Sequence, residues 1–359
     1  MNPLIGVKTL AGLNRAVIYR IGAVGLALMV TAILLWAIGA SPMEVATRLW
    51  QGAFGTEARV ARLLMTLAPL VLASAGLAFT FAAGLYNLGV EGQIAMGAIS
   101  TTLALRLFES VLPAPVTIGL GLVFGLMGGA MWGLLVGWLN VFGKVNEIFA
   151  GLGLNFVAQG LAIYLIFGPW KRPGVASLSG TEPFARQLWL PTAAGSDASW
   201  IALAIAAVAL VFTIVTLRGT YFGLKLRAVG NNLRASYVLG IPAVRQRLSA
   251  FGLCGALAGV AGALQILAVF HRLIPNISSN LGFLGLLVVM LAGFDALWIL
   301  PIALFFSALN VGSLQLPLTL DLDSSLAGVI QGCLVLFILL GRGVAERGVF
   351  RGKRTARSR

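Results

Sequence analysis

Long apolar runs recur from one end of this chain to the other, and they constrain the fold more than any other feature. A helix needs about 20 apolar residues to cross a bilayer. Only 10% of the residues are charged, whereas a soluble domain is about 25% charged. The chain is therefore predicted to be an all-α polytopic membrane protein. Its ten predicted transmembrane helices span residues 18–39, 60–84, 92–108, 116–140, 148–168, 199–217, 249–270, 281–292, 296–311 and 325–341.

The predicted membrane domain covers residues 18–341, and its eighth segment is unusual. The run 281–292 is too short to cross as a straight helix. A broken or re-entrant segment is tolerated at membrane depth only where protein surrounds it. Glycines also cluster, and small residues let helix backbones approach closely. Close helix packing is predicted for Gly119, Gly121, Gly125, Gly128, Gly129, Gly133 and Gly137.

The distribution of basic residues predicts the orientation of the chain. It holds 25 Lys and Arg against 11 Asp and Glu, a net charge of +14. Positive residues mark the cytoplasmic side of a membrane protein, and they gather near the amino terminus, in the loop 218–248 and in the tail 342–359. We therefore expect cytoplasmic termini, with residues 1–17 and the basic tail inside, a cytoplasmic loop at 218–248 and an external loop at 169–198. The charge is explained by topology, so no nucleic-acid partner is expected.

Groups suited to catalysis are few. Cys254 and Cys333 lie in apolar runs without metal-site spacing, and we expect buried free thiols. The only histidine, His271, is expected to be an interfacial polar residue at the outer end of a helix. Residues 137–144 approach a phosphate-binding loop, but their spacing is wrong and they lie in a membrane helix. No metal, cofactor or enzymatic activity is predicted, and ATP hydrolysis would require a separate subunit.

The segment Gly84–Gln93, with the sequence GLYNLGVEGQ, is the most informative. It places Asn87 and Glu91 among three glycines between two apolar runs. Glycine permits an interrupted helix, and a broken helix presents polar groups at membrane depth that suit a transported polar solute. A short cytoplasmic turn with a solvated Glu91 explains the same residues, and both interpretations remain open.

The basic loop 218–248 is the second informative segment. Asn231 or Asn232 is a suitable N-cap for a short predicted helix at Leu233–Leu239. Such a helix on the cytoplasmic face could dock a soluble partner. The alternative is a basic loop that only sets topology, and the segment taken alone favours this alternative.

Together, these segments resemble the permease subunits of bacterial ABC importers of the branched-chain amino acid, ribose and simple-sugar group. The resemblance covers most of residues 60–345 and is nearest to nucleoside uptake permeases. Asn87–Gln93 is similar to a motif of nucleoside and simple-sugar members. Asn146-Glu147 followed by Asn155 resembles a helix start in this group, and Leu226–Ile241 resembles its cytoplasmic coupling loop.

The resemblance implies a type II ABC importer-like permease in a bacterial inner (plasma) membrane. Its implied partners are cytoplasmic ABC ATPase subunits, a second permease subunit, usually a different one, and an external substrate-binding lipoprotein of the BMP type. The residues implied to line or shape the substrate path are Asn87, Glu91, Gln93, Glu147 and Asn155. Those implied to form the ATPase-coupling loop are Arg227, Gly230, Asn231, Arg234, Ala235 and Gly240.

A small, neutral, polar solute fits the few charges within the membrane, and a nucleoside is favoured. Simple sugars and branched-chain amino acids remain alternatives, because Gly293–Asp295 departs from the Gly-Asn-Pro pattern of relatives. A more distant alternative is an ion-coupled secondary transporter with Glu91 as proton relay. A membrane-embedded enzyme is disfavoured, because no clustered catalytic set is present.

Overall fold

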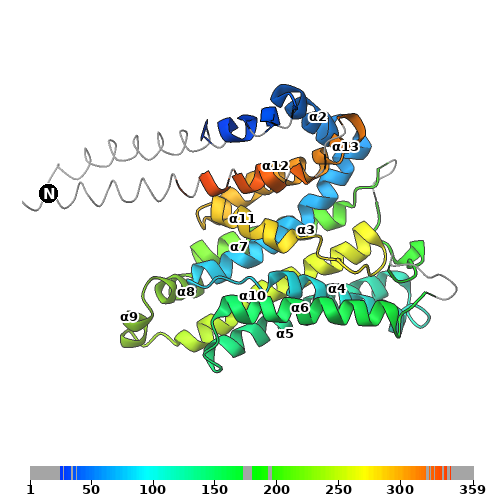
Figure 1. Cartoon of the computed structure of the whole chain (residues 1–359). Helices are drawn as coiled ribbons and strands as arrows, with labels where there is room; N and C mark the ends of the chain where they lie inside the picture. Colours follow the sequence, from blue (N-terminus) through cyan, green and yellow to red (C-terminus); the bar gives the residue numbers. More distant parts are fainter. Residues whose placement is uncertain are drawn as a thin grey trace, which may run out of the picture. The chain divides into compact units, whose positions relative to one another are not determined.

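Figure 1 shows the chain in a computed structural model. It divides into two units, Glu57–Ser307 and a second unit formed by the residues up to Thr56 and from Ala308 onward. The predicted cytoplasmic segment 1–17 and tail 342–359 lie outside the described residues. The structure describes residues 25–26, 28–33, 35–37, 39–172, 180–192, 196–320, 323, 325–326, 328–333, 335–337 and 340.

Helices make up the unit Glu57–Ser307, and the described residues contain no β-strand, which confirms the all-α class. A π-helix at Gln265–Phe270 continues α10, and 3-10 turns lie at Arg186–Leu188 and Ala296–Trp298. The α-helices are α3 (Glu57–Ala82), α4 (Val90–Phe108), α5 (Ala114–Val141), α6 (Glu147–Phe167), α7 (Trp200–Gly219), α8 (Tyr221–Asn231), α9 (Leu233–Val238), α10 (Ala243–Leu264), α11 (Leu281–Leu291) and α12 (Ile299–Ser313), which continues into the second unit.

Six helical segments of the described residues are long and apolar enough to cross a membrane, and a seventh is reached if Leu28–Ala37 and Pro42–Phe54, bent by 106°, form one span. Leu281–Leu291 and Gly328–Phe337 are apolar but shorter. The multi-pass membrane fold is confirmed, whereas the predicted count of ten transmembrane helices is not. The difference arises because an apolar run of residues can form a helix that is too short, or too strongly bent, to cross a membrane.

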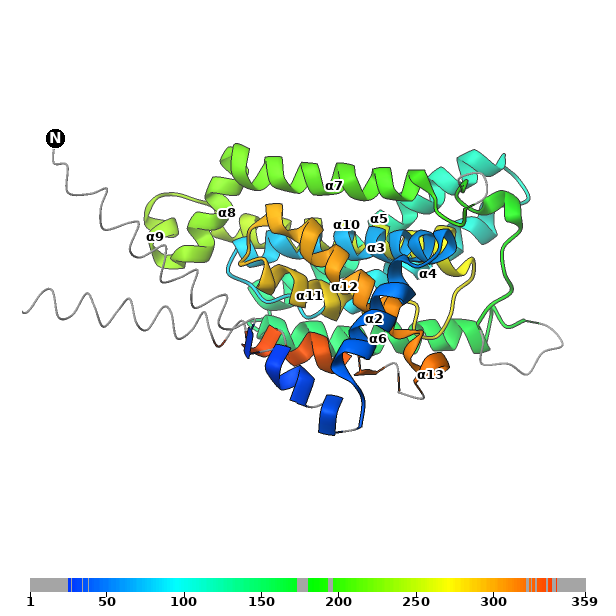
Figure 2. The same cartoon turned by 90° about the horizontal axis from the view of Figure 1, so that it is seen from above.

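The helix α3 forms the centre of its unit. Of its apolar window, 89% is buried, against 28% for α6 and 33% for α7. Figure 2 shows α6 and α7 on opposite sides of the unit, with α3 and α10 between them. A helix that is apolar all round is buried in protein or faces lipid, so α3 is the protein-enclosed member and the two flanking helices present apolar surface outward.

Glycines allow α4, α5 and α10 to pack backbone against backbone. A Cβ added to Gly129 of α5 would lie 2.2 Å from the carbonyl oxygen of Gly255, and one added to Gly97 of α4 would lie 2.4 Å from Cα of Gly259. The predicted packing role is therefore confirmed on this face of α5, although Gly119 has open space around it. The buried glycines of α5 are Gly121, Gly125, Gly129, Gly133 and Gly137.

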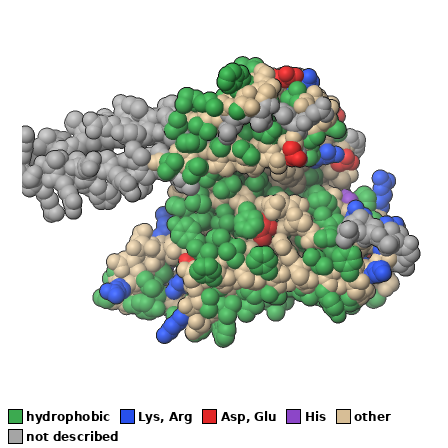
Figure 3. Space-filling view, in the orientation of Figure 1, with side chains coloured by type: hydrophobic (Ala, Val, Ile, Leu, Met, Phe, Trp, Pro, Cys, Tyr) green, Lys and Arg blue, Asp and Glu red, His purple; other side chains and the backbone are tan. Residues whose placement is uncertain are grey.

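The surface of this unit has a membrane-like distribution of side chains. Figure 3 shows hydrophobic side chains over its middle and Lys and Arg near its two ends. Met131, Phe156 and Val208, from α5, α6 and α7, are each more than half exposed. Large exposed apolar side chains on several helices suit contact with lipid or with a protein partner.

The half-length helix α11 corresponds to the run 281–292 that was predicted to be broken or re-entrant. The chain enters it through Ser279 and Asn280, with φ of 49° and 60°, and leaves through Gly293 and Phe294, with φ of 66° and 65°. These left-handed conformations turn the backbone sharply and are costly for residues other than glycine. Both ends of α11 are therefore set by tight turns.

An ion pair holds the turn that follows α11. Asp295 Oδ1 accepts a hydrogen bond from the N–H of Leu297, and Asp295 Oδ2 pairs with Arg218 at the end of α7. The carboxylate of Asp295 thus joins two helix ends.

The described part of the predicted external loop packs onto the segment that follows α10. Backbone N–H groups of Phe184 and Leu190 donate to the carbonyls of His271 and Leu267, each at 2.9 Å. The ring of His271 stacks on Trp189 with centroids 3.6 Å apart, and burial of the ring lowers its pKa. His271 therefore lies at the end of a helix, as predicted, and serves as a packing residue.

The second unit contains α2 (Pro42–Phe54), α13 (Leu316–Thr319) and residues from Ala308 onward. A Cβ on Gly52 would lie 2.6 Å from the carbonyl oxygen of Gly312. Leu35, Val45 and Leu316 form a small buried cluster. Close backbone contact and apolar burial therefore join α2 to the end of α12 and to α13.

We predict that Gly259→Ala lowers the thermal stability of the purified protein, because its Cβ would lie 2.2 Å from the carbonyl oxygen of Gly125. Overpacking of this kind typically costs about 1–3 kcal/mol. The matched control is Gly119→Ala, whose added Cβ meets no atom within 4 Å. Equal melting temperatures for the two variants in a detergent-stability assay would contradict the packing assignment.

Candidate functional site

A buried amide pair closes the break between α3 and α4. Asn87 Nδ2 donates to Gln93 Oε1 at 3.1 Å, and Gln93 Nε2 donates back to Asn87 Oδ1 at 3.3 Å. Asn87 also accepts from the N–H of Gly89 and donates to Sγ of Cys254, each at 3.1 Å. These side chains are inaccessible to solvent, which confirms the predicted burial of Cys254, whereas Cys333 is only partly buried and its predicted full burial is wrong. Unpaired polar groups cost several kcal/mol in a membrane, so this pairing stabilises the broken segment.

Asn155 of α6 joins the two sides of the same break. Its Oδ1 accepts from the N–H of Gly92, and its Nδ2 donates to the carbonyl oxygen of Leu88, each at 2.8 Å. The approach of α6 is close, since a Cβ on Gly151 would lie 2.5 Å from the backbone nitrogen of Gly89. One side chain thus satisfies a donor and an acceptor that the break leaves without helical partners.

Glu91 caps the half-length helix α11. Its Oε1 accepts from the N–H of Phe283 at 2.9 Å, one of the first-turn N–H groups that a helix leaves unpaired. A carboxylate at this position also interacts favourably with the helix dipole. Only 2% of Glu91 is exposed, so the expectation of a solvated Glu91 is wrong. Its Oε2 is buried and has no hydrogen-bond partner among the described residues.

Glu147 belongs to a separate cluster at the start of α6. Its Oε2 accepts from Asn140 Nδ2 at 3.1 Å, and Asn140 Oδ1 accepts from Arg247 at 2.7 Å. Asn146 caps α6 by accepting from the N–H of Ile148 at 2.9 Å, so the predicted helix start is confirmed. The cluster ties α5, α6 and α10 together, and the role of Glu147 in a substrate path stays a prediction.

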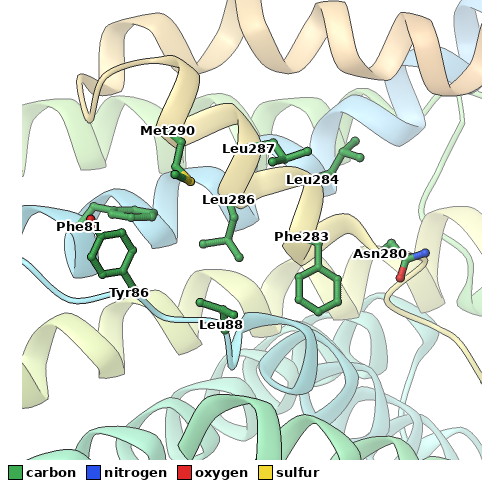
Figure 4. A pocket seen from close by; sticks show the side chains of 9 residues that line it. All are labelled: Phe81, Tyr86, Leu88, Asn280, Phe283, Leu284, Leu286, Leu287 and Met290. Atoms are coloured by element: carbon green, nitrogen blue, oxygen red, sulfur yellow. The ribbon is translucent and has the colours of Figure 1, made fainter. Parts of the chain in front are cut away.

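A pocket of about 330 Å³ opens between the end of α3, the break and α11 (Figure 4). Phe81 and Tyr86 lie at one end and Phe283 lies toward the other, with Leu88 and Leu286 between them. The rings of Phe81 and Tyr86 meet edge to face with centroids 5.4 Å apart. The complete lining is Phe81, Tyr86, Leu88, Asn280, Phe283, Leu284, Leu286, Leu287 and Met290.

The buried polar residues around the break do not line this pocket. Asn87, Glu91, Gln93 and Asn155 are not among its lining residues. Two of them instead hold the backbone of residues that are, because Asn155 binds the carbonyl of Leu88 and Glu91 binds the N–H of Phe283. Glu91 and Asn155 thus hold the backbone of two lining residues, and a role of the four residues in a substrate path stays a prediction.

The loop 218–248 forms α8, α9 and the start of α10. Asn232 begins α9, because its Oδ1 accepts from the N–H of Ala235 at 3.0 Å, so one of the two predicted caps is confirmed. Asn231, Arg234 and Ala235 are exposed, and Gly240 turns the chain after α9 with φ of 69°. The short predicted helix is present.

At the end of α8, Gly230 lies in close contact with Ala82 and Gly84, at the start of the break between α3 and α4. A Cβ on Gly230 would lie 2.4 Å from the carbonyl oxygen of Ala82, and one on Gly84 would lie 2.9 Å from the carbonyl oxygen of Gly230. Arg227 donates to the carbonyl oxygen of Leu217 at the end of α7. Gly230 therefore makes a contact within the chain, whereas most residues of α9 are exposed.

Sequence reasoning missed the apolar surface of α9. Tyr237, Val238 and Leu239 are 57%, 89% and 74% exposed, beside the exposed Arg234. Three adjacent large apolar residues within a basic loop were the available signal. A mixed apolar and basic surface suits a protein partner better than water alone.

The comparisons agree with this architecture. The family model described as "Branched-chain amino acid transport system / permease component" matches residues 59–339. The guanosine ABC transporter permease protein NupP of Bacillus subtilis is 27% identical, over 88% of this chain and 91% of the relative.

Two further relatives are named for different solutes. The nucleoside ABC transporter permease protein NupB of Lactococcus lactis subsp. cremoris is 27% identical over 84% of each chain. The glucose ABC transporter permease protein TsgB13 of Haloferax volcanii is 28% identical, over 87% of this chain and 84% of the relative. The family model covers most of a chain with several apolar membrane-length helices. The chain therefore belongs to the branched-chain amino acid transport system permease family of ABC transporters.

Proposed function

We propose that this chain is a permease subunit of an ATP-driven importer that carries a nucleoside into the cytoplasm. The observation that carries the proposal is the match, over 84% or more of the chain, to permeases named for guanosine and for nucleosides. The permease has no enzymatic role of its own, and separate ABC ATPase subunits hydrolyse ATP. A simple sugar is the second candidate, favoured by the similarity to TsgB13.

The assembly contains a second, different permease subunit. Support comes from two pairs of relatives, NupP with NupQ of Bacillus subtilis and NupB with NupC of Lactococcus lactis, in which both members are similar to this chain. An external substrate-binding lipoprotein delivers the nucleoside. Both termini and the α8–α9 loop face the cytoplasm, residues 180–192 face outward, and the assembly lies in the plasma membrane.

The α8–α9 loop transmits the movement of the ATPase. The exposed surface of α9, with Arg234 and Val238, docks on the ATPase, where apolar area supplies affinity and the charge sets orientation. The contact between Gly230 and Gly84 then passes a displacement of the loop to the break between α3 and α4. The path-shaping residues Asn87, Glu91, Gln93 and Asn155 lie in or against that break.

Uptake of labelled guanosine tests the proposed function. Cells that lack their own nucleoside uptake, and that express this chain with its second permease, ATPase and lipoprotein, are expected to accumulate guanosine. Accumulation should stop when ATP is depleted while the proton gradient is maintained. Transport that follows the gradient and ignores ATP would establish an ion-coupled transporter instead, and uptake of glucose without guanosine would favour the sugar alternative.

We predict that Arg234→Glu and Val238→Asp each abolish substrate-stimulated ATP hydrolysis by the reconstituted transporter. Both place a carboxylate on the exposed surface of α9, so docking is lost while insertion into the membrane continues. Lys171→Glu, at an exposed site after α6, is the charge-matched control and should keep wild-type activity. ATP hydrolysis at the wild-type rate in both α9 variants would remove the coupling assignment.

Two variants of Glu91 distinguish a helix-capping role of this residue from a role in proton coupling. Glu91→Gln keeps a side-chain oxygen that can accept from the N–H of Phe283, so most ATP-driven uptake is expected to remain. Glu91→Leu removes the acceptor and leaves that N–H unpaired, at a cost of about 1–3 kcal/mol, and uptake should fall severalfold. If Glu91→Gln instead stopped transport as completely as Glu91→Leu, the carboxylate itself would be required.

A further inference from the structure

The pocket between the end of α3 and α11 has the character of a site for a flat ring. Phe81, Tyr86 and Phe283 supply aromatic groups and Leu88 and Leu286 supply aliphatic ones. Its volume of about 330 Å³ lies within the range of small-molecule sites, about 300–1,000 Å³. We propose that the permease holds the base of the nucleoside in this pocket, an inference that rests on the proposed function.

Stacking on a nucleobase is the interaction that these lining residues favour most. Every nucleobase has a π-face, and aromatic side chains bind such faces in a sequence-tolerant way. Tyr86 and Phe283 are 45% and 39% exposed, so their rings are accessible from outside the protein. A base that packs against Leu88 and Leu286 meets an aromatic ring toward either end of the pocket.

The lining disfavours the other solutes of this family. A sugar carries several hydroxyl groups, and each hydroxyl that is buried without a partner costs free energy. An amino acid carries an ammonium and a carboxylate, yet all nine lining residues are uncharged. The base is the part of a nucleoside that loses least on entering such a pocket, and the ribose can remain at its open side.

Asn280 adds a polar group to this apolar lining. It is exposed and held in a left-handed conformation with φ of 60° immediately before α11. Its side chain does not cap α11, and an amide offers both a donor and an acceptor. Such a group can pair with the polar edge of a base while the ring stacks on Phe283.

The pocket is preorganised by the buried polar network behind it. Glu91 binds the N–H of Phe283 and Asn155 binds the carbonyl of Leu88. The backbone positions of two lining residues are therefore fixed before a ligand arrives, which reduces the entropy lost on binding. Glu91 and Asn155 are positioning residues that act through Phe283 and Leu88.

A photoreactive nucleoside tests the site directly. The two permease subunits and the ATPase are reconstituted in vesicles without the lipoprotein and irradiated with 8-azidoguanosine. The labelled peptides are then identified by mass spectrometry. Labelling is expected within residues 81–93 and 280–290, and guanosine should suppress it whereas ribose should not. The lipoprotein is omitted so that affinity reflects the permease alone.

Ring-face variants identify the stacking partner. Phe283→Leu keeps an apolar side chain and removes the aromatic face, so the concentration for half-maximal labelling should rise about tenfold, as expected for loss of one base stack. Phe283→Tyr keeps the face and should label like the wild type. Phe156→Leu is the matched control, since Phe156 is 74% exposed on α6 and lies outside the pocket.

The outcomes separate this site from the proposed function. Guanosine uptake by the wild type, with labelling elsewhere or with no effect of Phe283→Leu, overturns the pocket and leaves the function intact. Labelling of the same peptides by a photoreactive phospholipid that guanosine cannot displace assigns the pocket to lipid and also overturns it. A wild-type transporter that takes up no nucleoside overturns the proposed function itself.

Discussion

The satisfaction of backbone polar groups at the break between α3 and α4 is the constraint on which this structure depends. A helix that stops inside a membrane protein leaves N–H and C=O groups that no water is available to pair. Asn87 pairs with Gln93 and with the N–H of Gly89, and Asn155 pairs with Gly92 and Leu88. Each amide serves as both donor and acceptor, which is why Asn and Gln suit this position.

The same break lies between the two surfaces to which we assign function. On one side, Gly230 of α8 contacts Ala82 and Gly84 so closely that no side chain fits between them. On the other, the chain continues through Tyr86 and Leu88 into the pocket wall. In the proposed transporter, movement of the α8–α9 loop therefore reaches the pocket through a few residues of continuous chain.

Sequence patterns located the important segments better than they assigned roles. The cap of α9, the half-length α11 and the start of α6 follow from local chemistry that a sequence displays. The inward position of Gly230 and the cap that Glu91 provides to α11 depend on tertiary contacts. Phe283 was missed because, in a chain this apolar, the sequence does not distinguish a pocket-lining apolar residue from one that faces lipid.

In the proposed transporter, the break between α3 and α4 links the α8–α9 loop to the pocket. Hydrogen exchange of the assembled transporter, with and without a non-hydrolysable ATP analogue, measures this link. Protection of amides in residues 84–89 and 281–283 should change together with that of residues 233–240. A change confined to residues 233–240, with the other two segments unaltered, would show that the loop and the pocket are not linked.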